Sequence, residues 1–153
     1  MTRQKSLRGF SLNEVVVVLA LGAIVALTAV PTVNAFFARY QLMSASNQLG
    51  FDIARARMQA VGQNRFVRIK MLNSTQYARE TSTDGSTWSS RVTTNLPKGV
   101  TATTTSAEVQ FDRRGFATVN NSITVKAVNT RVLQVKTVTT SVIGQVSIGT
   151  ATS

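Results

Sequence analysis

The sequence predicts an α+β fold in which a long N-terminal helix packs on a C-terminal head of antiparallel β-structure. Three observations lead to this prediction. An almost uninterrupted apolar run extends from Phe10 to Val30. Apolar residues at helical spacing then continue to about Gln63. Beyond that point the chain is rich in Thr, Ser, Val and Asn, and polar and apolar residues alternate with the period of a strand.

The first element is a short basic segment followed by the apolar run. Residues 1–9, MTRQKSLRG, are polar and contain no acid. Cations beside an apolar helix hold that end in the cytoplasm. The 21 residues from Phe10 to Val30 would form a helix about 31 Å long, enough to cross the core of a bilayer. We therefore expect a transmembrane segment over residues 10–31.

Three interpretations of this segment compete. The first is a secretory signal peptide cut after Ala35, where Val33-Asn34-Ala35 offers a small-residue site. The second is a plain membrane anchor. The third is an anchor whose basic leader is removed in the cytoplasm. Glu14 favours the third. A deep, unpaired carboxylate costs about 2.5–3.5 kcal/mol on insertion, and neither of the first two interpretations requires it. Cleavage after Gly9 would create an α-amino group at Phe10 for Glu14 of a neighbouring subunit to pair with.

The residues from Arg8 to Glu14, read as Arg-Gly-Phe-Ser-Leu-Asn-Glu, resemble the type IV prepilin signal. The resemblance implies that a membrane prepilin peptidase cuts after Gly9 and that Phe10 is then N-methylated. It implies that Glu14, the fifth mature residue, serves assembly, and that Pro31 is the helix-distorting proline of pilins. The implied protein has the pilin fold. It spans the bacterial inner membrane once, in contact with its lipid, with its head outside, before entering a filament with other subunits.

Residues 32–64 contain no proline and are expected to continue the helix past Pro31 as an amphipathic half. Gly62 and Asn64 are typical of a helix stop. The apolar residues at helical spacing are expected to face the head, and they are Phe36, Phe37, Tyr40, Met43, Leu49, Ile53, Ala56, Ala60 and Val61.

Residues 65–153 are predicted to form the β-rich head. Alternation places Val67, Ile69 and Met71 on one face. Turns are expected at Asn73-Ser74 and at Asp84-Gly85. We expect two antiparallel sheets packed against the amphipathic half of the helix. Further strands are expected at residues 76–80, 99–104, 108–112, 117–119, 123–128, 131–137 and 142–148. The expected inward pairs are Val109 with Phe111, Ile123 with Val125, and Leu133 with Val135.

Two stretches of the head, Asp84-Gly85-Ser86-Thr87-Trp88 and Val109-Gln110-Phe111-Asp112-Arg113-Arg114-Gly115-Phe116, resemble the GspH/FimT group of minor pilins and pseudopilins. The resemblance implies a low-copy subunit of a type II secretion pseudopilus or a type IV pilus. The expected organisation is a leader at residues 1–9, a transmembrane half-helix at 10–31, an amphipathic half-helix at 32–64 and a head at 65–153.

The composition argues against an enzyme and against a metal or cofactor site. The chain has no Cys and no His, so a disulfide framework and the commonest metal ligands and general base are missing. No two of its acids are spaced as a metal-binding pair. The six acids are Glu14, Asp52, Glu80, Asp84, Glu108 and Asp112.

The charge points to anionic partners. Lys and Arg number 17 against six acids, a formal net charge of +11. Removing residues 1–9 takes away three cations and leaves 14 against six, or +8. DNA, phospholipid and acidic neighbouring subunits would all complement such a chain.

The alternative function is that of a DNA-binding minor pilin for natural transformation. FimT-like proteins, by resemblance, bind DNA through a Gly-Arg motif near the C-terminus, but the matching stretch here, Gly144-Gln145-Val146-Ser147, lacks both cations. The remaining candidate contacts are Arg113, Arg114, Arg68 and Lys70. For the adjacent pair Arg113 and Arg114 we favour a solvated turn or a contact with an acidic neighbouring subunit.

Overall fold

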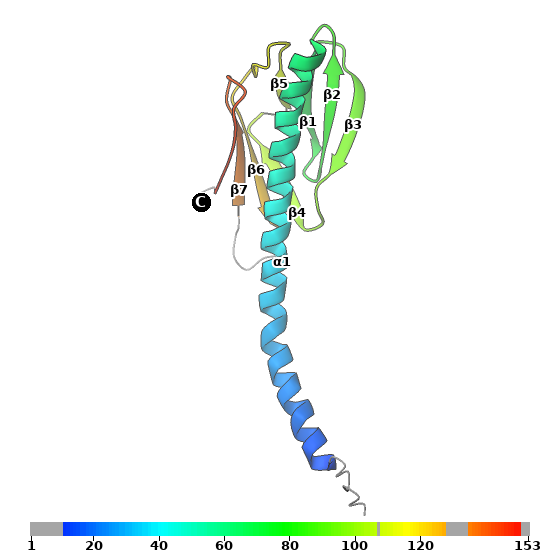
Figure 1. Ribbon diagram of the computed structural model, residues 1–153, viewed down its shortest axis with the longest axis vertical. Coiled ribbons are helices and arrows are strands. Elements are labelled where there is room, and N and C mark those ends of the chain that lie inside the picture. Colours follow the sequence, from blue (N-terminus) through cyan, green and yellow to red (C-terminus); the bar gives the residue numbers. More distant parts are fainter. Residues whose placement is uncertain (1–10, 107, 128–134, 151–153) are drawn as a thin grey trace, which may run out of the picture. The chain divides into compact units, whose positions relative to one another are not determined.

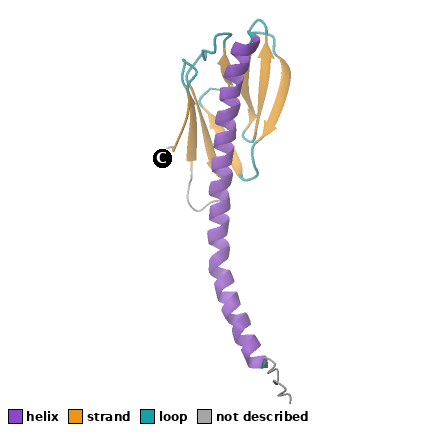
Figure 2. Cartoon of the chain, in the orientation of Figure 1, coloured by secondary structure: helices purple, strands orange, loops and turns teal. Residues whose placement is uncertain are grey.

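The computed structural model describes residues 11–106, 108–127 and 135–150, except for the side chains of residues 27–32. Gly9, Phe10, Arg131 and Leu133 lie outside this part of the chain. The chain forms two compact units, residues 1–36 and 37–153. The first contributes the beginning of helix α1 (Leu12–Gln63), and the second contributes the rest of α1 and the strands (Figures 1 and 2).

Helix α1 begins at a serine cap. The Ser11 hydroxyl accepts a hydrogen bond from the Glu14 backbone N–H at 3.3 Å, and Ser followed by Glu three residues later is the capping-box pattern. The helix continues through Pro31, as predicted. Large apolar side chains from Leu12 to Val25 are exposed. Where side chains are described, no helical stretch has both the length and the hydrophobicity needed to cross a membrane.

The other end of α1 confirms the predicted stop. Asn64 adopts a left-handed φ of 50°. Its N–H bonds to the Val61 carbonyl at 3.3 Å, and the Arg65 N–H bonds to the Ala60 carbonyl at 3.1 Å. These two bonds form a Schellman cap, which satisfies carbonyls that the helix end would otherwise leave unpaired.

The head contains two antiparallel four-stranded sheets, in the orders β3-β2-β1-β5 and β4-β6-β7-β8. The strands are β1 (Phe66–Asn73), β2 (Gln76–Ser82), β3 (Ser89–Asn95), β4 (Val100–Thr104), β5 (Glu108–Phe111), β6 (Asn121–Ala127), β7 (Val135–Thr140) and β8 (Val146–Thr150). Two sheets against the amphipathic half of the helix were predicted, and this is confirmed.

Three strand assignments need correction. Strand β3 was not predicted, because it is an exposed edge strand made of polar residues apart from Val92 and so shows no alternation. Residues 117–119 form no strand, and Ala117 makes only an isolated bridge to Phe111. Residues 142–145 form the turn before β8 rather than its start, because Gly144 takes a φ of 78°.

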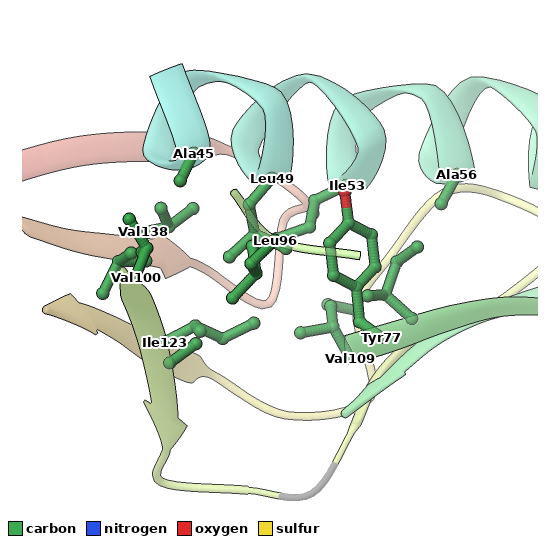
Figure 3. Close-up of a cluster of buried hydrophobic side chains, with 14 of the residues drawn as sticks. Ala45, Leu49, Ile53, Ala56, Tyr77, Leu96, Val100, Val109, Ile123 and Val138 are labelled. Atoms are coloured by element: carbon green, nitrogen blue, oxygen red, sulfur yellow. The ribbon is translucent and has the colours of Figure 1, made fainter. Parts of the chain in front are cut away.

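The core lies between α1 and the inward faces of both sheets (Figure 3). Val67 and Ile69 are buried as predicted, and so are the pairs Val109 with Phe111 and Ile123 with Val125. Tyr77 of β2 is also buried, and its hydroxyl donates to the Asp52 carboxylate of α1 at 2.6 Å. Burial and this carboxylate raise the pKa of Tyr77. The bond ties β2 directly to the helix.

The prediction of which helix face meets the head was partly wrong. Leu49, Ile53, Ala56 and Ala60 are buried as expected, but they share that face with Leu42, Ala45 and Ser46. Small side chains let the helix backbone approach the sheets closely, and the Ser46 hydroxyl is satisfied by donating to the Leu42 carbonyl at 2.8 Å. The bulkier residues assigned to this face are exposed instead, and they are Phe36, Phe37, Tyr40, Met43 and Val61.

Candidate functional site

The head portion of α1 carries a second apolar face, which we call the α1 stripe. Its residues recur three or four positions apart, so they share one side of the helix. Tyr40, Phe51 and Met58 are each more than 60% exposed. The full stripe is Tyr40, Met43, Asn47, Phe51, Ala54, Met58 and Val61. Its azimuth is opposite to that of the residues buried in the core.

The stripe has the residue spacing of a helix-packing surface. Between Tyr40 and Phe51 its side chains border an open depression, together with Ser44 and Gln48. Spacings of three and four residues are those of side chains that interdigitate between packed helices. Asn47 is the polar member, and a polar residue in such a seam fixes register. Large exposed apolar patches mark interaction sites. The stripe is therefore the candidate assembly surface of the head.

A network of ion pairs crosses the other face of the first sheet. The buried Glu80 carboxylate of β2 bonds to Arg68 of β1 at 2.7 Å and to Arg91 of β3 at 2.5 Å. Arg68 also bonds to Glu108 of β5 at 2.8 Å and lies 4.1 Å from the ring centre of Trp88. Burial by itself would raise the pKa of Glu80, but the bonds from the two arginines outweigh it and lower the pKa. The network links all four strands.

The predicted DNA contacts are divided between two places in the fold. Arg68 and Lys70 lie two residues apart on β1, whereas Arg113 and Arg114 lie in the turn after β5. Arg68 is held by the ion-pair network, and Arg113 donates to the Thr83 carbonyl at 2.6 Å. These two guanidinium groups are thus already engaged within the chain. Binding of DNA through these residues stays a prediction.

A close contact fastens the turns of the head to α1. The Arg57 side chain donates from Nε to the Gly115 carbonyl at 3.0 Å. Gly144 packs on the same two groups, because a Cβ there would lie 2.5 Å from the Gly115 oxygen and 2.6 Å from Arg57 Nε. The sequence offered no sign of this contact, since its members are distant along the chain.

The structure places the predicted processing and assembly residues only in part. Glu14 lies exposed in the first turn of α1, and Pro31 lies within the helix. Gly9 and Phe10 are outside the described residues. In the part of the chain that the structure describes, no three His, Cys, Asp or Glu side chains gather to hold a metal ion.

A family model decides the classification. The model described as "Type II transport protein GspH" matches residues 45–144, from the buried face of α1 to the glycine of the last turn. The chain belongs to the GspH family. The two motif stretches of the head indicated this family, and that prediction is confirmed.

Solved structures show the same fold at low identity. The minor pseudopilin EpsH from the type 2 secretion system of Vibrio cholerae matches with a TM-score of 0.62 and 10% identity, over 72% of this chain and 97% of EpsH. The type IV minor pilin FimU of Pseudomonas aeruginosa matches with a TM-score of 0.59 and 18% identity, over 74% of this chain and 92% of FimU. A search of curated proteins finds no match.

Proposed function

We propose that this GspH protein is a minor subunit of a type IV pilus or a type II secretion pseudopilus, and that it acts by assembly rather than by catalysis. One observation supports the proposal most strongly: α1 has two apolar faces, of which the head buries one and leaves the stripe exposed. The second face contributes nothing to the packing of the head itself, because it stays exposed to solvent. A subunit that packs among other helices requires it.

The energetics favour a helical partner for the stripe. Fully burying a large apolar side chain stabilises by about 1.5–3 kcal/mol. Tyr40, Met43, Phe51 and Met58 are all more than half exposed, so their burial against neighbouring helices would offset a substantial part of the entropy lost on association. The spacing of the stripe then sets how those helices interdigitate.

The proposal extends to processing. A prepilin peptidase cuts after Gly9, Phe10 is methylated, and residues 10–31 hold the subunit in the inner membrane until it is incorporated. The exposed apolar side chains from Leu12 to Val25 support this view of the first unit. Glu14 then pairs with the terminal amine of an adjacent subunit. Pairing of a carboxylate in an apolar layer determines register more than it adds stability.

Glu14 also has a local role that an experiment must separate from pairing. As the third helical residue after the Ser11 cap, it stands where Glu or Gln completes a capping box. Gln also fits the capping-box pattern but has no charge. We expect Glu14→Gln and Glu14→Ala to be processed normally and yet to be recovered in sheared filaments about tenfold less than the wild type, which corresponds to about 1.4 kcal/mol.

Mass spectrometry of the mature N-terminus and quantification of the filament fraction measure both effects. Gly9→Leu is the processing control and should leave an uncut precursor that still begins at Met1. Normal incorporation of Glu14→Gln would show that capping, not charge pairing, is what Glu14 supplies. A native chain that begins at Phe36 would overturn the proposed processing altogether.

The stripe is tested by Phe51→Glu. The new carboxylate would have to be buried against a neighbouring helix, so we expect the variant to be processed but lost from filaments. The free energy of unfolding of the isolated subunit should change by no more than about 0.5 kcal/mol, because Phe51 is at the surface.

Val92→Glu is the matched control, since Val92 is a similarly exposed apolar residue on the edge strand β3. It should enter filaments normally. Equal incorporation of Phe51→Glu and Val92→Glu would remove the stripe from the assembly surface.

A further inference from the structure

Two loops at one end of the head are joined by hydrogen bonds and carry exposed apolar side chains. The Ala117 N–H donates to the Val142 carbonyl at 2.8 Å, and the Val142 N–H donates to the Asn120 side chain at 2.7 Å. These bonds join loop 112–120 to loop 141–145, which can be located by their colours in Figure 1. Together the loops display four apolar side chains that are 45–60% exposed, and we call them the tip patch: Phe116, Val119, Val142 and Ile143.

The tip patch is held rigidly. Arg57 donates to the Gly115 carbonyl, and Gly144 packs against both groups without room for a Cβ. Within the second loop, the Gly144 N–H bonds to the Ser141 carbonyl at 2.8 Å. Fixed loops lose little conformational entropy when a partner binds, so an apolar surface of this kind is pre-organised for docking.

The tip patch continues from the α1 stripe. Val61 is the last residue of the stripe, and its Cγ2 lies 2.9 Å from the position of a Cβ on Gly115. Phe116 follows Gly115 directly. The helix face proposed for assembly therefore ends next to the loops, with Arg57 at the junction, and an occupant of one surface lies beside the other.

The charge beside the patch disfavours a second copy as its occupant. Arg113 and Arg114 lie in the loop that carries Phe116. Of the five side-chain carboxylates beyond residue 36, Glu80 and Glu108 are paired with arginines of the same chain. The other three accept hydrogen bonds from neutral donors, and they are Asp52, Asp84 and Asp112. A second copy would bring the same excess of cations, since the chain has 17 Lys and Arg against six acids, so like charges would oppose one another.

We propose that the tip patch docks a different pilin-like subunit, one whose contact surface combines apolar side chains with uncommitted carboxylates. The inference rests on the proposed function and adds the chemistry of the neighbour. The apolar patch supplies affinity, and the arginines select an acidic partner over a second copy of this basic chain.

The lack of cysteine in the chain gives a clean test. Ile143→Cys places one thiol in the patch, and Thr103→Cys places one on the exposed surface of β4 as a control. Both full-length variants are expressed in the native host and treated with a maleimide. We expect Cys at position 143 to react in the isolated subunit but about tenfold less in filaments, and Cys at position 103 to react similarly in both.

A benzophenone maleimide on the same thiol then identifies the occupant. The expected adduct is a different, acidic pilin-like protein, and Arg114→Glu added to Ile143→Cys should lower its yield about fivefold, whereas Arg114→Lys should not. An adduct with a second copy, with lipid or with DNA would overturn the inference, as would full reactivity in filaments. If the chain is missing from filaments in every variant, the proposed function fails instead.

Discussion

Replacing Gly144 with alanine is expected to destabilise the head by about 3 kcal/mol, through a left-handed backbone and the absence of space. Gly144 has a φ of 78°, and a Cβ there would meet the Gly115 carbonyl oxygen at 2.5 Å and Arg57 Nε at 2.6 Å. The arginine can swing aside, but the carbonyl belongs to a hydrogen-bonded turn. Relief therefore requires loop 112–120 or loop 141–145 to move.

Chemical denaturation measures the loss. The single tryptophan, Trp88, stacks on Arg68 of β1, so its fluorescence reports on the first sheet. Gly144 precedes β8 of the second sheet. Gly149→Ala is the matched control, because no atom lies within 4 Å of its added Cβ, and it should change stability by less than about 0.5 kcal/mol. A Gly144→Ala variant as stable as Gly149→Ala would mean that the loops yield easily. The rigidity argued for the tip patch would then be lost.

Gly144 also shows where sequence reasoning stops. In the sequence it stood out only as the glycine of the stretch Gly144-Gln145-Val146-Ser147, which lacks both cations of the FimT-like DNA-binding motif. Its physical role depends on Arg57 and Gly115, and no local pattern connects positions so far apart. By contrast, the end of α1 could be predicted from Gly62 and Asn64, because a helix stop depends on residues that are adjacent in the sequence. Sequence patterns therefore predicted features that depend on adjacent residues, and missed a contact between distant ones.

The error over the helix faces has a related cause. Phe37, Tyr40 and Met43 recur at helical spacing, and so do Ala45 and Leu49. Spacing alone shows that apolar faces exist, but not which of them meets the head. The structure places Ala45 and Leu49 against the head and leaves Phe37, Tyr40 and Met43 exposed. A chain with two apolar faces is itself the signal of a second packing partner, and it was visible in the sequence.

The second large effect is expected at Glu80. Glu80→Ala leaves Arg91 without its carboxylate and Arg68 with only Glu108, so stability at pH 7 should fall by about 3 kcal/mol, as when one partner of a buried ion pair is removed. Glu80→Gln should lose less, since its amide oxygen can still accept one bond. Glu108→Gln is the matched control, because Glu108 is 33% exposed and holds one arginine, and it should cost about 1 kcal/mol or less.

The pH dependence distinguishes the charge of Glu80 from its packing. Its folded pKa is lowered below the ordinary value of 4.5, so the carboxylate stabilises the head fully above that value and loses its effect as the pH falls through the folded pKa. The difference in melting temperature between wild type and Glu80→Gln should therefore be constant from pH 7 to about 5 and shrink below about 4. A difference that persists unchanged to pH 3 would assign the loss to side-chain shape. The side chains of the network would then stabilise the four strands by packing, and their charges would contribute little to the free energy of unfolding.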